Sequence, residues 1–137
     1  MTARDRPRTA QRAATLLAAV LALGGCAGQA GDAPADGGPV TDHVRVGLTE
    51  WTVETGGVRA SVGEVTLVVT NTGATGHDVV VQGTRGTWGT PVLDPGESHE
   101  IVVETVPGEV LDLVCTVTGH HAAGMSTTLA VAAGDAP

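Results

Sequence analysis

Four residues in this chain carry side chains that together can bind a soft metal ion. Cys115, His120 and Met125 lie in one short run, and His77 stands alone roughly forty residues upstream. A thiolate, imidazoles and a thioether suit a copper ion that cycles between two oxidation states, because soft sulfur favours Cu(I) while imidazole serves both states. The residue types therefore point to copper as the cofactor.

The run that ends at Met125 contains two adjacent histidines, so it can be read in two ways. Its sequence is Cys-Thr-Val-Thr-Gly-His-His-Ala-Ala-Gly-Met. With His120 as the second imidazole the spacing is Cys-x4-His-x4-Met, and with His121 it is Cys-x5-His-x3-Met. Both readings place a thiolate, an imidazole and a thioether in one loop, and the spacing alone leaves the choice open.

The N-terminus has the pattern of an export leader. Four arginines fall within the first twelve residues, residues 13–23 are apolar, and a small-residue cleavage pattern ends at Cys26. The apolar run is too short to span a bilayer as a permanent helix. The segment resembles a bacterial lipoprotein signal, which implies that residues 1–25 are removed as a signal peptide and that Cys26 is lipidated. The expected location is extracytoplasmic, with a lipid anchor in the bacterial cell membrane.

A lipidated Cys26 would leave Cys115 without a partner for an internal disulfide. A lone thiol in an oxidising compartment is reactive unless it is buried or bound to metal. A buried structural cysteine is the plainer interpretation. The spacing from Cys115 to His120 and Met125 favours a metal ligand instead, because a structural cysteine does not require it.

The charge of the chain restricts its partners. The net charge is −8, and removal of the leader would leave three arginines and fourteen of the fifteen acidic residues, a net charge of −11. Nucleic acid is excluded as a partner because a phosphate backbone requires a basic surface. The charge suits a redox partner protein with a basic docking patch. Membrane contact is expected through the lipid anchor only.

The rest of the chain divides into a linker, one domain and a short tail. Residues 26–42 comprise the lipidated cysteine and a flexible linker rich in Gly, Ala, Asp and Pro. Residues 43–133 are expected to form a single copper-binding domain, and residues 134–137 are a C-terminal tail.

Short Val- and Thr-rich runs separated by turn signals predict an all-β domain, an antiparallel sandwich or barrel. Alternation places Cys115 at the end of the core face of one strand and His77 at the start of the core face of another, so one end of a sandwich would bring them together. The expected strands cover residues 43–54, 64–71, 77–82, 98–105, 109–116 and 126–133, with a further short strand around 58–62.

Three segments of this domain resemble the cupredoxins, the small blue-copper proteins. They are Gly-Glu-Val-Thr-Leu-Val-Val-Thr-Asn-Thr-Gly leading to His77, then Leu-Asp-Pro-Gly-Glu-Ser at 93–98, then the run from Cys115 to Met125. The resemblance implies an eight-stranded antiparallel Greek-key β-sandwich. It also implies that His77, Cys115 and His120 are equatorial copper ligands and that Met125 is a weak axial ligand.

The resemblance also implies a supporting role for Asp78. A polar residue after the upstream histidine commonly ties the two ligand loops together by hydrogen bonds. An exposed carboxylate without such a role is the alternative. The chain departs from the family in having no Phe or Tyr, so Val, Leu and two Trp residues must fill its core.

The ligand set predicts an electron carrier and not an enzyme. Four protein ligands leave no open coordination position for a substrate, unlike a catalytic metal site. We therefore expect a blue-copper protein that binds one copper ion and carries one electron. The alternative is a protein for copper storage, delivery or tolerance at the cell surface.

Overall fold

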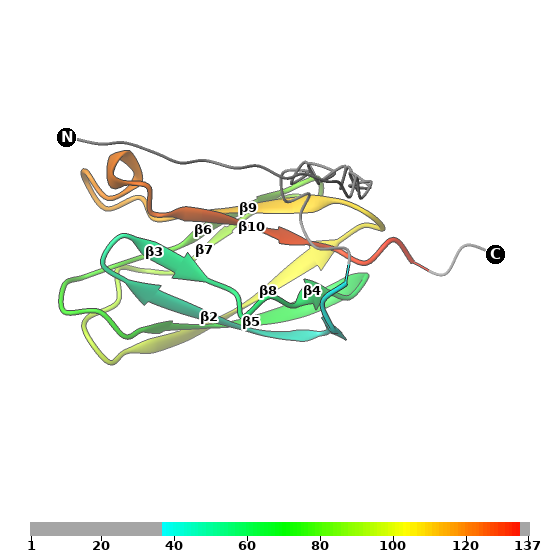
Figure 1. Cartoon of the computed structure of the whole chain (residues 1–137), viewed down its shortest axis with the longest axis horizontal. Helices are drawn as coiled ribbons and strands as arrows, with labels where there is room; N and C mark the ends of the chain where they lie inside the picture. Colours follow the sequence, from blue (N-terminus) through cyan, green and yellow to red (C-terminus); the bar gives the residue numbers. More distant parts are fainter. Residues whose placement is uncertain (1–36, 135–137) are drawn as a thin grey trace, which may run out of the picture. The chain divides into compact units, whose positions relative to one another are not determined.

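The computed structural model describes residues 37–134, so the expected leader, Cys26 and the last three residues lie outside the described part of the chain. The described residues fold as two β-sheets packed face to face (Figure 1). Among these residues no helix is both long and apolar enough to cross a membrane. The strands are β1 (Val40–Thr41), β2 (His43–Thr49), β3 (Thr52–Glu54), β4 (Arg59–Ala60), β5 (Gly63–Asn71), β6 (Val80–Gly83), β7 (Gly86–Gly89), β8 (Ser98–Thr105), β9 (Val110–Val114) and β10 (Ser126–Ala130), with the 3-10 turn η1 (His121–Ala123) before β10.

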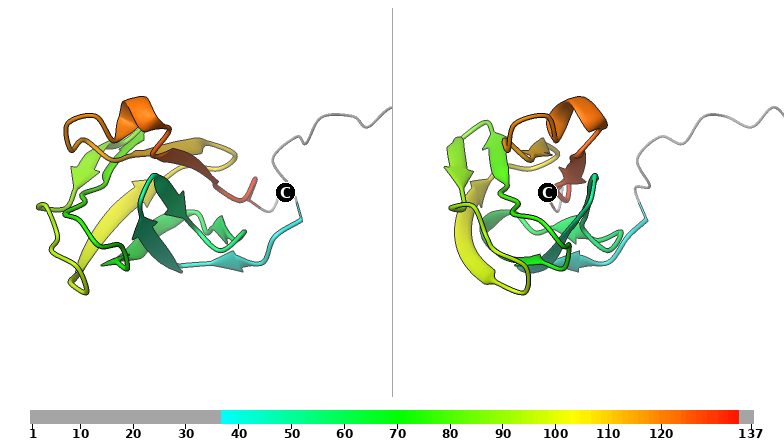
Figure 2. Two further views of the ribbon diagram at one scale, coloured as in Figure 1. Left: turned by 60° about the vertical axis from the view of Figure 1, so that its left-hand side comes forward. Right: turned by 90° about the vertical axis from the view of Figure 1, so that its left-hand side faces the viewer.

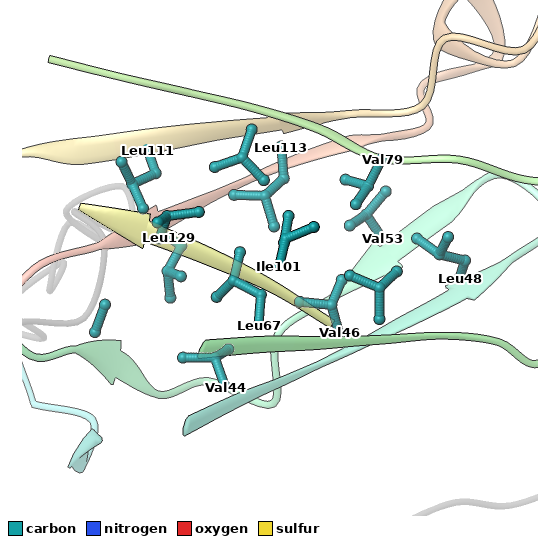
Figure 3. Packing of buried hydrophobic residues seen from close by; sticks show 14 of the residues in the cluster. Val44, Val46, Leu48, Val53, Leu67, Val79, Ile101, Leu111, Leu113 and Leu129 are labelled. Atoms are coloured by element: carbon teal, nitrogen blue, oxygen red, sulfur yellow. The ribbon is translucent and has the colours of Figure 1, made fainter. Parts of the chain in front are cut away.

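The strands form because apolar and polar residues alternate along them. In β5, Val65, Leu67 and Val69 are fully buried while the residues between them face outward. Side chains from both sheets meet in one aliphatic core (Figure 3). The core contains no Phe or Tyr, because the chain has none, and Trp88 packs only against its margin. The predicted all-β sandwich is confirmed.

The two main sheets have four strands each, in the orders β10-β9-β6-β7 and β3-β2-β5-β8. Most neighbours are antiparallel, as predicted, but β2 and β5 pair in parallel. The short strands β1 and β4 also pair in parallel, so the fold begins within the segment 26–42 that was expected to be linker. A parallel pair needs a crossover, and the residues between β2 and β5 supply it.

The expected strand 43–54 is interrupted, because it folds back on itself. Thr49 of β2 pairs with Thr52 of β3, so Glu50 and Trp51 form a two-residue hairpin turn. Trp51 adopts a φ of 71°, a left-handed conformation that favours glycine. Hairpin turns are usually signalled by Gly or Asn. Neither residue type occurs in this turn, which is why sequence patterning missed it.

Three further differences concern strand ends. The strand expected at 77–82 begins at Val80, and the unpredicted β7 follows it and pairs with it. The expected strand 126–133 ends at Ala130, and Val131 continues only as an isolated bridge to Ala60. The strand expected at 109–116 likewise ends at Val114, so Cys115 is the first residue beyond it.

Neighbouring valines on β8 provide a matched test of the core. Val103 is fully buried and Val102 is 51% exposed. We expect Val103→Ala to lower the free energy of unfolding by about 2 kcal/mol, because two methyl groups leave the core and a cavity remains. Val102→Ala should cost less than about 1 kcal/mol, since only strand preference changes. Urea unfolding of both variants measures the difference, and equal losses would contradict the placement of the core.

Candidate metal centre

The candidate ligands lie in two loops at the same end of the sandwich. His77 belongs to the loop between β5 and β6, and Cys115, His120 and Met125 belong to the loop between β9 and β10. The hairpin turn between β2 and β3 lies at this end as well (Figure 1). In the right-hand view of Figure 2 this end faces the viewer, with η1 at its upper edge.

Three of the predicted ligand side chains converge. The donor atoms of His77, Cys115 and His120 all lie within 4.8 Å of one another, and all three residues are buried. The Nδ1 atoms of the two imidazoles are 3.1 Å apart, and Cys115 Sγ lies 3.6 Å from His120 Nδ1. The structure therefore brings the thiol and imidazole of one loop together with an imidazole from a distant part of the sequence.

The adjacent histidines lie in different surroundings. The ring of His120 faces His77 and Cys115, whereas His121 begins η1 and is exposed. Gly119 has a φ of 85° and Gly124 a φ of 96°, so the chain turns sharply before His120 and again before Met125. These turns direct one histidine inward and the other outward.

Met125 lies beside the cluster and is fully buried. Its carbonyl oxygen accepts a hydrogen bond from the Cys115 N–H at 3.1 Å, and its own N–H donates to the His120 carbonyl at 3.1 Å. The backbone thus links Met125 directly to two residues of the cluster. A buried methionine whose backbone is bonded to two residues of the cluster is compatible with the weak ligand that the sequence predicts.

The position of His77 depends on a buried asparagine that sequence reasoning missed. Asn71 Nδ2 donates to the carbonyl oxygens of Thr75 and Leu93, and its Oδ1 accepts from the Gly73 N–H. His77 and Leu93 exchange two backbone hydrogen bonds, which fix the other side of the loop. In the sequence, Asn71 falls in step with Val65, Leu67 and Val69, which form the buried face of β5. A polar residue on a core face indicates such a role, because buried polar groups need hydrogen-bond partners.

Asp78 joins the two ligand loops. Its Oδ1 accepts a hydrogen bond of 2.6 Å from the Thr116 N–H, and its Oδ2 accepts a short one from the Thr116 hydroxyl. Thr116 follows Cys115 directly, so these bonds tie the segment of His77 to the segment of Cys115. Asp78 is buried and therefore does not match the alternative of an exposed carboxylate.

Glu50, in the β2–β3 turn, contacts His77 from outside the cluster. Its Oε1 lies 3.2 Å from His77 Nε2 and also accepts the N–H groups of Ala74 and Thr75. These backbone donors, with Ala74 the strongest, lower the pKa of Glu50 to about 2, against a smaller opposing effect of burial. The sequence placed Glu50 inside a strand and gave no signal for this contact.

Trp51, the next residue, contacts the other imidazole. Its ring lies edge-on to that of His120, with centroids 4.8 Å apart and planes at 83°. Trp51 is 48% exposed and His120 only 9%, so a half-exposed indole packs against a nearly buried imidazole. The other tryptophan, Trp88, lies on β7 and packs against the margin of the core.

The environment of Cys115 keeps its thiol protonated in the absence of a metal. Burial raises the pKa of Cys115, and the nearby Asp78 carboxylate raises it further. The backbone N–H groups of Asp78 and Val117 point toward the sulfur and act in the opposite direction. A bound cation would reverse this balance, because metal coordination deprotonates a thiol.

The donor atoms fit one metal ion. Two nitrogens that each bind the same ion at about 2.0–2.1 Å can lie no more than about 4.2 Å apart. A nitrogen and a sulfur can lie slightly farther apart, because the bond from the metal to sulfur is longer. Two of the separations, 3.1 and 3.6 Å, satisfy this limit, and all three donor atoms lie within 4.8 Å of one another, so a small movement of one side chain would complete the fit. Imidazole and thiolate donors select zinc, copper and related ions over Mg²⁺ or Ca²⁺. The cluster is therefore suited to a soft or borderline metal ion.

Asp78 supports a prediction about the Cys115 thiol. Asp78→Asn keeps an oxygen that accepts the Thr116 N–H but removes the negative charge, so the thiol pKa should fall in the metal-free protein. Asp78→Ala removes both hydrogen bonds and should lower the free energy of unfolding by about 1–3 kcal/mol. Thiolate absorbance as a function of pH and thermal unfolding measure the two effects. Asp112→Asn, exposed on β9, is the control and should change neither.

Comparison with known proteins identifies the fold. No protein-family model matches the chain, and no curated protein matches its sequence significantly. Among solved structures, the dithionite-reduced auracyanin from Roseiflexus castenholzii is similar with a TM-score of 0.59 at 19% identity, over 68% of this chain and 98% of that one.

Two further auracyanins are also similar. Auracyanin A from Chloroflexus aurantiacus, described as a "blue" copper protein, has a TM-score of 0.52 at 17% identity over 67% of this chain and 98% of its own. Auracyanin B has a TM-score of 0.51 at 20% identity, over 73% of this chain and 91% of its own. These neighbours are cupredoxins, so the sandwich that carries His77, Cys115 and His120 has the cupredoxin fold.

Proposed function

We propose that this protein binds one copper ion through His77, Cys115, His120 and Met125 and carries single electrons. The observation that carries the proposal is the buried convergence of the Cys115 thiol with two imidazole Nδ1 atoms. The likeness to auracyanin A, a "blue" copper protein of the same fold, supports the choice of copper. When bound there, copper supplies a one-electron redox couple.

The residues around the ligands support a carrier because they hold the site in one geometry. Asn71 and Leu93 fix the loop of His77, and Asp78 fixes that loop to the segment of Cys115. Ligands held in place by protein hydrogen bonds change position little when the charge of the site changes. Burial of the ligands also keeps water away from the site.

The same arrangement argues against an enzyme. Four protein donors would occupy the positions around one ion, whereas a catalytic site keeps one position open for water or substrate. Among the four candidate ligands, only His120 is exposed at all, with 9% of its surface accessible. The ring of Trp51 packs against its imidazole. Electrons would therefore pass to and from a partner at this end of the sandwich.

We infer an extracytoplasmic location from the leader and Cys26, which lie outside the described residues. Lipidation of Cys26 would hold the protein at the cell membrane and place it near membrane-bound redox proteins. A net charge of −11 after removal of the leader favours a partner with a basic docking patch. Storage, delivery or tolerance of copper is the alternative function, and the experiments below distinguish it.

Adjacent histidines give a matched test of the ligand set. The purified full chain with Cu(II) should show the intense visible thiolate-to-copper band and narrow copper hyperfine splitting of a blue site. His120→Ala should abolish or strongly weaken the band because an equatorial ligand is lost, whereas His121→Ala should leave it nearly intact because His121 is exposed. A pale Cu(II) spectrum in the unaltered protein would refute the copper assignment.

Copper retention separates a carrier from a delivery protein. We expect the reduced protein to keep Cu(I) against a competing chelator and to survive repeated oxidation and reduction, because its ligands are positioned before the ion binds. Optical spectra and metal analysis after each cycle give the fraction retained. Transfer of most of the copper to the chelator within one cycle would favour storage or delivery.

A further inference from the structure

The turn between β2 and β3 contacts both imidazoles of the site, although it contributes no ligand. Its two residues are consecutive, and each meets a different histidine. Glu50 Oε1 lies 3.2 Å from His77 Nε2, and the ring of Trp51 lies 4.8 Å from that of His120. The turn is thus a third segment of the site, beside the two loops that carry the candidate ligands.

The Glu50 carboxylate determines which ring nitrogen of His77 carries a proton. The other nitrogen then presents its lone pair to the cluster. A carboxylate only accepts hydrogen bonds, so His77 Nε2 must carry the proton that it donates. In the neutral imidazole Nδ1 is then unprotonated, and it is directed toward His120. The same Oε1 accepts the N–H groups of Ala74 and Thr75, which prevent the carboxylate from moving away.

Gly73 makes this contact possible. A Cβ atom at Gly73 would lie 2.7 Å from Glu50 Oε1 and 2.9 Å from His77 Nε2. Its φ is not in the left-handed region, so alanine is compatible with the backbone there. The glycine therefore serves to leave space for the carboxylate and the imidazole.

Trp51 is held in a backbone conformation that favours glycine, with a φ of 71°. Such a conformation in a large residue points to a use for the side chain. The indole is half-exposed and covers the side of His120 that would otherwise face solvent. It restricts the rotation of the imidazole and the access of water and small ligands to it.

We propose that the Glu50–Trp51 turn is a positioning element that holds both imidazoles, fixing the protonated nitrogen of His77 and shielding His120. This inference rests on the proposed copper site. Because Glu50 also places a negative charge next to His77, it favours the more positive Cu(II) state. The turn would therefore lower the reduction potential as well as raise the copper affinity.

The charge and the contact of Glu50 can be tested separately. Glu50→Gln keeps an acceptor oxygen and removes the charge, so we expect the reduction potential to rise while the blue spectrum persists. Gly73→Ala keeps the charge but displaces the carboxylate and presses on the imidazole of His77, and we expect the Cu(II) affinity to fall about 10-fold to 100-fold. Glu54→Gln on β3 and Gly47→Ala on β2 are the controls, because Glu54 is exposed and a Cβ at Gly47 meets nothing closer than 4.0 Å.

The ring of Trp51 can be tested without straining the turn. Trp51→Gly removes the ring and relaxes the backbone, so a loss of function cannot come from a misfolded turn. We expect about a 10-fold loss of copper affinity and faster removal of copper by a chelator. Trp51→Phe keeps an aromatic ring and should restore most of both properties.

Nitrogen NMR of the metal-free full chain tests the proposal independently of copper. His77 should be protonated at Nε2 in the unaltered protein and should lose this fixed form in Glu50→Ala. A proton on Nδ1 of His77, or wild-type potential and affinity in all the turn variants, would overturn the proposal. A protein that shows the expected His77 form but no blue site would refute the copper function alone.

Discussion

The site depends on a bridge of two hydrogen bonds between Asp78 and Thr116. These residues follow His77 and Cys115, which lie far apart in the chain and enter the site from different loops. Each loop also has its own internal bonds, through Asn71 in one and the Met125 backbone in the other. The ladder between β6 and β9, which pairs Val80 with Val114, brings the two loops together, and the bridge extends this pairing to the residues that follow the ligands. The convergence of the thiol and imidazoles follows from this pairing.

Burial gives this arrangement its chemical character. The thiol lies in an apolar interior, where burial raises its pKa, and it faces two imidazoles whose Nδ1 atoms point to the same place. Polar groups of this kind are costly to bury unless they have partners. Within residues 37–134 no buried side-chain nitrogen or oxygen lacks a hydrogen-bond partner. The sandwich therefore accommodates a polar ligand set at the end of an aliphatic core.

The β2–β3 turn adds a layer of control around the ligands. Glu50 and Trp51 are neighbours in the chain, yet one provides charge and a hydrogen-bond acceptor and the other an apolar shield. Ligand identity selects the metal, whereas residues behind the ligands adjust its affinity and potential. Dividing these tasks between loops and a separate turn would allow the potential to change while the ligand set stays the same.

The sequence by itself determined the donor types, the all-β class and the core faces of the strands. Alternation in residues 64–71 and 98–105 predicts strands that the structure confirms, because one face of each must be buried. It also placed His77 and Cys115 near strand ends, where they meet. Only the tertiary structure decided between His120 and His121, because loop spacing does not state which ring faces inward. It likewise revealed Glu50, since a contact across 27 residues depends on how the hairpin folds back, and no turn residue signals that fold.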